Sequence, residues 1–165
     1  MRLRKLEQKD AEFMLEWMHD ESVVRHMSAN FAEKTLQDCQ RFIEYSQNCE
    51  EDLNLAIVDQ DDTYMGTVSL KHINFQEKTA EFAITIRKEA MGQGYSAYGM
   101  QEIIRIGFEE LDLEKILWCV SVDNQRAVRF YDKNGYQRTT DIPQYYKECY
   151  SDEQLKTFIW YVINK

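Results

Sequence analysis

The chain has 165 residues, which is enough for one domain with a hydrophobic core of its own. Its composition, 44% hydrophobic and 13% aromatic, is that of a globular protein and excludes a disordered chain. The net charge of −9 argues against nucleic-acid binding, because phosphate backbones require basic surfaces. No apolar run approaches the roughly 20 residues that cross a bilayer, and the N-terminus has no signal-peptide pattern. We expect a single cytoplasmic domain over residues 1–165, without a nucleic-acid or membrane partner.

The cysteines and histidines predict neither a disulfide nor a metal centre. The four cysteines lie far apart and form no CxxC pair, so reduced thiols are expected. His19, His26 and His72 show no metal-ligand spacing, and we expect them to be solvated or packing residues. The acidic balance would favour cationic small molecules as ligands.

Taken in chain order, the first elements are a strand and two helices. Residues 2–6 alternate between basic and apolar side chains, as a short strand does. Residues 9–20 and 33–47 carry apolar side chains at helical spacing, with Asp10 and Thr35 as predicted N-caps.

Three antiparallel strands are predicted next. Residues 53–73 contain two alternating runs around an acidic turn, which is typical of a hairpin. Residues 78–87 form a third strand of the same kind, with Phe82, Ile84 and Ile86 on one face.

The second half of the chain is predicted to alternate helices with strands. A long amphipathic helix follows the glycine-containing stretch 91–100, and an almost wholly apolar strand covers 115–122. A short helix over 124–136 closes at an Asn-Gly pair, and a last strand covers 155–163. The expected fold class is α/β (α+β), a single domain with a mixed, mostly antiparallel sheet flanked by helices.

The stretch "MGQGYSAYGM" contains three of the six glycines in the chain. It lies between a strand and a helix, where free N–H groups and the helix dipole form an anion site. A plain glycine turn is the alternative. A Walker A loop is excluded because no Lys-Ser or Lys-Thr follows. Gly92, Gly94 and Ala97 match the dinucleotide fingerprint formally, with Asp123 ending the next strand, but three antiparallel strands before the fingerprint disfavour that fold.

A third interpretation also accounts for the segment after Asp123. The glycine stretch, followed by "LEKILWCVSVDNQRAVRFYDKNGYQR", resembles the GNAT superfamily of N-acetyltransferases, whose Q/R-x-x-G-x-G/A turn binds the pyrophosphate of acetyl-CoA. Residues 3–27 also look like the start of members related to ribosomal-protein and polyamine acetyltransferases. A second family pattern, N-x-x-A-x-x-x-Y-x-K-x-G-F/Y, is matched by Asn124, Ala127, Tyr131, Lys133, Gly135 and Tyr136.

The resemblance implies acetyl-CoA as cosubstrate and no metal. The first motif departs at Met91, the Gln/Arg position, and at Ser96, the final Gly/Ala position, while Gly94 is kept. Both changes are compatible with a turn that binds mainly through backbone amides. The residues implied to contact the cosubstrate are Ile84, Ile86 and Arg87 through the strand backbone, Gly92, Gln93, Gly94, Tyr95, Ser96 and Ala97 in the turn, and Asn124, Ala127 and Lys133 in the next helix.

The resemblance also implies two catalytic groups for direct transfer in a ternary complex. An acceptor amine with a pKa of about 10 has to lose a proton, and the CoA thiolate leaves more easily when a hydroxyl protonates it. Tyr131 stands at the acid position of the family, the alternative being a core aromatic. Glu81 is the candidate base, directly or through water. Alternation places it opposite Phe82, as a surface residue unless a bulge re-aims it.

Three further features leave alternatives open. Cys119 lies in a motif segment, so an acetyl-cysteine intermediate is conceivable but poorly supported. Tyr145, Tyr146 and Tyr150 lie in a loop that either lines the acceptor pocket or is an ordinary surface connection. Asn124 either caps its helix or also contacts the pantetheine arm.

We therefore predict an acetyl-CoA-dependent N-acetyltransferase that acts on a primary amine of a small molecule or a protein N-terminus. Polyamines, amino sugars and peptide N-termini are equally compatible with the residues, and a homodimer is compatible with the resemblance. Two alternatives belong to other classes: a non-catalytic acyl-CoA-binding sensor or partner module, and a nucleotide-binding oxidoreductase.

Overall fold

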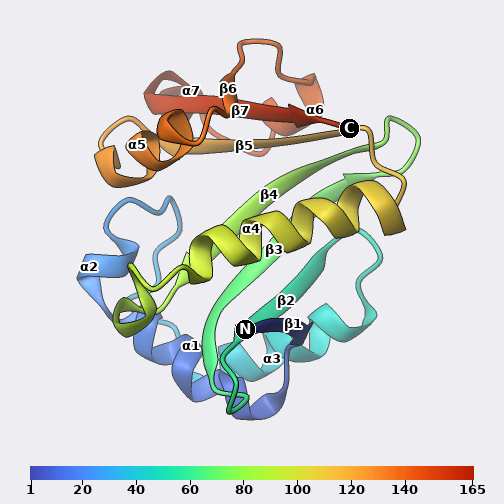
Figure 1. Cartoon of the computed structure of the whole chain (residues 1–165). Coiled ribbons are helices and arrows are strands. Elements are labelled where there is room, and N and C mark those ends of the chain that lie inside the picture. The colour runs from blue at the N-terminus through green and yellow to red at the C-terminus, as the bar shows by residue number, and fades with distance from the viewer.

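A seven-stranded sheet runs through the computed structural model, which describes residues 1–165 (Figure 1). Its order is β1-β2-β3-β4-β5-β7-β6, and every neighbouring pair is antiparallel except β4 and β5. This mixed, mostly antiparallel sheet confirms the expected fold class. The strands are β1 (Arg2–Lys5), β2 (Leu53–Val58), β3 (Tyr64–Asn74), β4 (Thr79–Ile86), β5 (Lys115–Ser121), β6 (Gln137–Arg138) and β7 (Phe158–Asn164).

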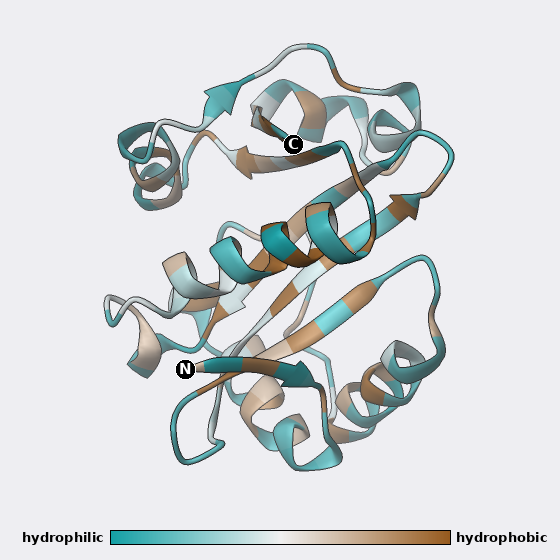
Figure 2. Ribbon diagram, turned by 45° about the vertical axis from the view of Figure 1, so that its right-hand side comes forward, coloured by the Kyte–Doolittle hydropathy of each residue, from teal (hydrophilic) through white to brown (hydrophobic).

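Helices cover both faces of the sheet (Figure 1). One face packs against α1 and α3 through a core that includes Trp17, Ile43 and Tyr64, and the other face packs against α4. Hydrophobic and hydrophilic residues alternate along α4 (Figure 2). The helices are η1 (Gln8–Asp10), α1 (Ala11–Met18), α2 (Glu21–Val24), α3 (Leu36–Asn48), η2 (Lys88–Ala90), α4 (Tyr95–Arg105), η3 (Ile106–Glu110), α5 (Gln125–Lys133), α6 (Gln144–Lys147) and α7 (Asp152–Thr157).

The sequence signals for helix starts have mixed outcomes. Thr35 caps α3 as predicted, in a reciprocal pair with Asp38. The predicted capping of α1 by the Asp10 side chain is wrong, because its carboxylate accepts hydrogen bonds from Arg4 and from the backbone N–H of Glu7. A buried carboxylate keeps its charge more easily beside a guanidinium than at an isolated cap.

The C-terminal segment contains two helices that were not expected. The predicted last strand begins at Phe158 rather than Leu155, because the Ser151 hydroxyl accepts from the N–H of Gln154 and starts α7 there. The predicted tyrosine loop contains α6. No helix in the structure is both long enough and apolar enough to span a membrane.

Helix α4 lies close to the sheet because Gly99 has no side chain. A Cβ atom there would lie 2.4 Å from the Cδ1 atom of Ile57 on β2. The helix continues into η3, a π-helical turn in which a Cβ on Gly107 would lie 2.9 Å from Ile116 of β5. The two glycines therefore fix the distance between α4 and the strands beneath it.

Strands β4 and β5 form a fork. They pair only over Thr79–Glu81 and Lys115–Leu117, and beyond these residues they diverge (Figure 1). The chain segments before and after the fork lie on opposite sides of it: β1 to β4 with α1 to α4 on one side, and β5 to β7 with α5 to α7 on the other.

Candidate active site

The glycine turn presents free backbone N–H groups at the N-terminus of α4. Gly92 and Gly94 have φ angles of +80° and +90°, which L-residues rarely adopt. The N–H groups of Gly92, Gly94, Tyr95, Ser96 and Ala97 donate no hydrogen bond to another backbone group. With the dipole of an eleven-residue helix behind them, they fit a phosphate or pyrophosphate.

The open edge of β4 lies next to this turn. The N–H of Arg87 bonds to the carbonyl of Met65 on β3, so alternation directs the backbone groups of Ile84 and Ile86 away from β3. β5 has already diverged there, which leaves these groups free for an extended ligand.

Arg87 belongs to the structural framework rather than to that edge. Its buried guanidinium binds both carboxylate oxygens of Glu16, at 3.0 and 2.9 Å, and the carbonyl of Tyr64. It also stacks over the Phe13 ring, 4.4 Å from the ring centre. The backbone contact predicted for Arg87 is not available through its N–H, which is bonded to the Met65 carbonyl, and its side chain is engaged as well.

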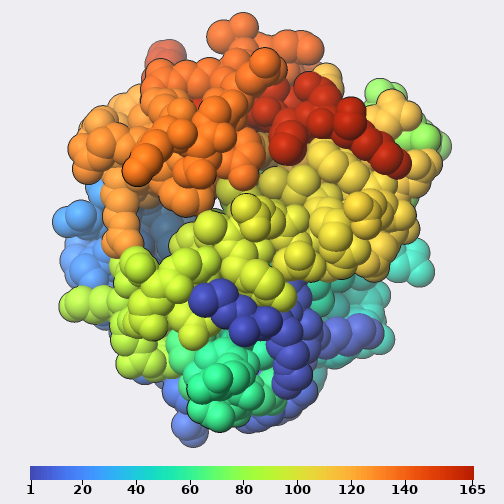
Figure 3. All heavy atoms as spheres, viewed as in Figure 1, coloured from blue at the N-terminus to red at the C-terminus, as the bar shows by residue number.

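Helix α5 faces the glycine turn across the fork. Figure 3 shows the surface hollowed between the orange atoms of this helix and the yellow-green atoms that lead into α4. Nη1 of Arg126 donates to the Met91 sulfur at 3.1 Å and so bridges the two walls. The polar side chains of the turn and of α5 point largely to solvent: Gln93 bonds the Glu89 carbonyl, and Lys133 is exposed.

Asn124 starts α5. Its side-chain oxygen accepts from the N–H of Ala127 at 3.2 Å, which is the capping role predicted for it. Ala127 is half-buried against the main core. These two residues set the position of α5, on which Tyr131 lies one turn further along.

Tyr131 is enclosed by aromatic rings. Its ring centre lies 5.3 Å from that of Trp118 and 5.1 Å from that of Tyr161. Burial raises the pKa of its hydroxyl above the ordinary tyrosine range, so the proton is retained at neutral pH. Trp118 is the residue after Leu117, the last β5 residue that pairs with β4. Because the Tyr131 ring packs against Trp118, Tyr131 also lies at the fork. Tyr131 is thus a core aromatic residue that carries a protonated hydroxyl at the fork.

Glu81 lies at the same fork on the opposite face of the sheet. It pairs with Lys71 and Leu117, and its neighbour Phe82 packs edge-on against Trp118 on the Tyr131 face. Strand alternation therefore places Glu81 as predicted, with no bulge at Glu81. The surface position, however, is wrong: the residue is only 2% exposed, because segments far along the chain cover this face.

Tyr150, which follows α6, covers the Glu81 carboxylate. Its hydroxyl donates a short hydrogen bond to Oε1 of Glu81. Burial, followed by the neighbouring Cys119 and Glu81, raises the pKa of Tyr150 far above its usual range. Oε2 of Glu81 is buried without a hydrogen-bond partner, and Nε2 of His72 lies 3.7 Å from it. Sequence reasoning missed the contact of Tyr150 and the position of His72, because neither belongs to a motif.

Cys119 also adjoins Glu81 but does not suit a nucleophile. Its sulfur lies 4.0 Å from Oε1 of Glu81. Burial and the adjacent carboxylate raise the pKa of the thiol to about 12, so almost none of it is thiolate at neutral pH. All four cysteines are free, as expected.

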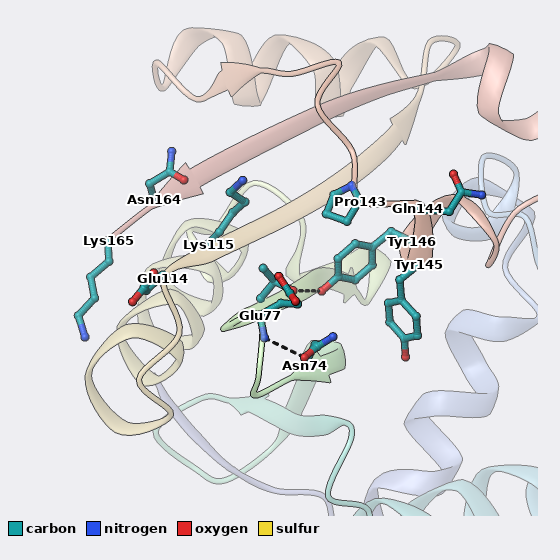
Figure 4. A pocket seen from close by; sticks show the side chains of 11 residues that line it. Asn74, Glu77, Glu114, Lys115, Pro143, Gln144, Tyr145, Tyr146, Asn164 and Lys165 are labelled. Carbon is teal, nitrogen blue, oxygen red and sulfur yellow. Dashed lines mark hydrogen bonds between the residues drawn. The ribbon is translucent and has the colours of Figure 1, made fainter.

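A pocket of about 670 Å³ lies at the other end of β4, away from the glycine turn (Figure 4). Glu77 and Glu114 lie on its walls with Lys115 and Lys165. Tyr146 also lines it and donates to Thr79 at 2.8 Å, the bond drawn in Figure 4. None of the predicted cosubstrate residues lines this pocket. No group of three or more His, Cys, Asp or Glu side chains is placed to hold a metal ion.

A family model for the acetyltransferase (GNAT) domain matches residues 1–137, most of the chain. The protein therefore belongs to the GNAT acetyltransferase family, which confirms the resemblance read from the sequence and the assignment as an acyltransferase. The formal dinucleotide match at Gly92, Gly94 and Ala97 is accordingly wrong as a sign of an oxidoreductase.

Similar proteins include several polyamine acetyltransferases. The spermidine N(1)-acetyltransferase of Vibrio cholerae is 28% identical over 137 residues, covering 81% of this chain and 77% of that protein. The Escherichia coli spermidine N(1)-acetyltransferase is 28% identical over 141 residues, covering 82% and 72%. A crystal structure of the Vibrio cholerae spermidine N-acetyltransferase in complex with CoA and spermine superposes with a TM-score of 0.82 at 21% identity, over 99% of this chain and 94% of the other.

The thiol of Cys119 is predicted to react more slowly than that of the exposed Cys149 with an alkylating reagent at pH 8. A pKa of about 12 leaves roughly a thousandth of the thiolate that a free cysteine has, so its labelling should be at least about 100-fold slower. Peptide mass spectrometry after timed iodoacetamide labelling measures this, with the exposed Cys149 as internal control. Labelling of Cys119 as fast as that of Cys149 would contradict the assignment and reopen an acetyl-cysteine route.

Proposed function

We propose that this protein transfers the acetyl group of acetyl-CoA to a primary amine of a small polycation, by direct attack in a ternary complex. The observation that carries the proposal is the fork between β4 and β5, with the hydroxyl of the buried residue Tyr131 on one face and the buried carboxylate of Glu81 on the other. Acetyl transfer to an amine needs one proton donor and one proton acceptor at the reacting centre.

Acetyl-CoA is supported by the shape and chemistry of the fork. The free N–H groups of the glycine turn suit its pyrophosphate, and the open backbone of Ile84 and Ile86 suits the amides of the pantetheine arm. A ligand extended along this edge leads from the turn toward Glu81 and Tyr131, where β4 and β5 meet. The relative from Vibrio cholerae that was solved with CoA has the same fold.

Tyr131 is the proposed general acid. Its hydroxyl forms no hydrogen bond with the protein, and its raised pKa keeps it protonated. As the tetrahedral adduct of amine and thioester collapses, the carbon–sulfur bond breaks and the tyrosine proton passes to the leaving sulfur. The proton that remains in excess on the amide nitrogen then passes to the tyrosinate and restores the hydroxyl. The water-poor aromatic surroundings favour this neutralisation of the thiolate.

Glu81 is the proposed general base, and its face of the sheet is the proposed acceptor side. The unpartnered Oε2 atom can take the proton of an ammonium group, directly or through one water. The polar residues Asn54 and Ser69 are buried on the same face, which suits a polar acceptor better than an apolar one. The net charge of −9 and the polyamine substrates named for the relatives favour a polycation.

The acceptor class is tested by acetyl-CoA-dependent thiol release from the purified protein. We expect turnover with spermidine or spermine, and little or none with amino sugars or N-terminal peptides. Turnover with one of the other classes alone would support the acetyltransferase activity but contradict the proposed acceptor class. Acetyl-CoA binding without thiol release on any amine would favour the non-catalytic acyl-CoA-binding module.

The substitution Tyr131→Phe should lower kcat by about 100-fold or more, since it removes the proton donor while keeping the ring packing. The KM for acetyl-CoA should change little. Tyr161→Phe is a matched control, because Tyr161 adjoins the same aromatic cluster but its hydroxyl bonds to Asp132. Steady-state kinetics on the best amine measures both, and an unchanged kcat in Tyr131→Phe would remove this residue from the mechanism.

The substitution Gly92→Ala should weaken acetyl-CoA binding by about tenfold, because a Cβ atom disfavours the +80° φ angle that the turn requires. Gly135→Ala has similar strain at φ +77° but lies outside the turn, and serves as control. Calorimetry measures the Kd of wild type and variant for acetyl-CoA and for S-acetylpantetheine, which lacks the pyrophosphate. The loss of affinity should be confined to acetyl-CoA. Equal losses for both ligands would contradict a pyrophosphate site at the turn.

A further inference from the structure

The proton balance of the proposed reaction raises a question about Glu81. An alkylammonium acceptor carries three protons on nitrogen, whereas the amide product carries one. One of the two lost protons ends on the CoA sulfur, and the other must reach solvent. If Glu81 accepts that proton, it has to release it before the next turnover. The following inference rests on the proposed function.

The surroundings of Glu81 leave one exit for this proton. Its carboxylate is buried, and Oε1 is occupied by the hydroxyl of Tyr150, whose raised pKa makes it a poor carrier. The thiol of Cys119 likewise keeps its own proton. Oε2 has no hydrogen-bond partner, and the imidazole of His72 is the basic group that approaches it, at 3.7 Å. A small rotation of the ring or one water closes that distance.

The backbone of β3 is distorted so that His72 occupies this place. The register between β3 and β4 shifts after Lys71, and His72 adopts a φ angle of +52°, an uncommon conformation for a residue other than glycine. Its N–H donates to Oδ1 of Asp52 at 2.9 Å, and its carbonyl accepts from the Tyr146 hydroxyl at 3.3 Å. In a regular strand, the side chain of residue 72 would point to the face of the sheet opposite that of Lys71 and Glu81.

The ring of His72 connects the buried carboxylate with the surface. Its side chain is about one-third exposed, 34%, whereas that of Glu81 is 3% exposed. It packs edge-on between Tyr145 and Tyr146, which line the pocket of Figure 4. Nε2 of the imidazole therefore faces the Glu81 carboxylate, while part of the His72 side chain is exposed to water.

We propose that His72 relays the acceptor proton from Glu81 to solvent. An N–H bond of the ammonium breaks and an O–H bond forms on Glu81. That O–H bond then breaks as Nε2 of the neutral imidazole takes the proton. The resulting imidazolium loses a proton to water, which restores both groups. Histidine suits this step because its ordinary pKa, about 6.5, allows it to gain and lose a proton near neutral pH.

The other charged and titratable groups around the pair do not offer the same path. Lys71 is the register partner of Glu81, but no hydrogen bond or ion pair joins their side chains, and Oε2 of Glu81 has no partner. The Asp52 carboxylate is engaged with the backbone N–H of His72. The remaining groups that face the pair are Tyr145 and Tyr146 on α6, Cys149 and Tyr150 after it, and Cys119 on β5.

The test uses His72→Asn and two forms of the best acceptor. Asparagine tolerates a positive φ angle, so the backbone is kept while the relay is removed. One form is the ordinary alkylamine, and the other is its β,β-difluorinated analogue, whose amine is largely neutral at an assay pH of about 8 and brings no surplus proton. We expect kcat to fall by about 10- to 100-fold on the alkylamine and by less than about twofold on the analogue. His26→Asn is the matched control and should behave as wild type.

A second variant separates the relay from a packing role. His72→Gly also suits the φ angle and leaves room for free imidazole, which should restore kcat on the alkylamine without changing the KM for acetyl-CoA. Wild-type kcat in His72→Asn on the alkylamine, or an equal loss on both amines, would overturn the relay. An inactive wild-type protein would instead overturn the proposed function, so the two failures are distinct.

Discussion

The fork between β4 and β5 is the constraint on which the rest of the structure depends. Each strand is held by its outer neighbour: β4 pairs with β3 from Glu81 to Ile86, and β5 pairs with β7 along its whole length. The two therefore cannot close on each other beyond their three paired residues. A parallel pair that opens in this way leaves strand edge, helix ends and side chains of both faces accessible at one point.

The fork also divides the chemistry between two environments. On the α5 face, stacked aromatic rings exclude water and keep a phenol protonated. The other face carries buried polar groups, and two polar atoms there, Nδ2 of Asn54 and Oε2 of Glu81, have no partner in the protein. Unpaired buried polar atoms are costly, and a polar ligand that satisfies them recovers part of that cost.

Local patterns in the sequence were sufficient for the elements that a short segment determines by itself. The glycine turn, the cap at Asn124 and the alternation of β4 depend on neighbouring residues, and the structure agrees with all three. The burial of Glu81 depends on Tyr150, which is 69 positions away, and no local pattern contains that information. The conformation of His72 also depends on residues far along the chain, because its backbone is hydrogen-bonded to Asp52 and Tyr146. The capping prediction for Asp10 failed for a different, local reason: its carboxylate accepts from Arg4 and from the N–H of Glu7, the N-cap of η1 one turn earlier.

The segment after residue 137 lies beyond the part that the family model matches, yet it supplies β7 and the side chains of Tyr146 and Tyr150. The glycine turn and the open edge of β4 belong to the matched part. The last 28 residues therefore add side chains to the Glu81 face of the fork, whereas the free N–H groups of the glycine turn come from the matched part alone. Under the proposed function, substitutions at Tyr146 or Tyr150 would reshape the acceptor side while the backbone of the glycine turn stays as it is.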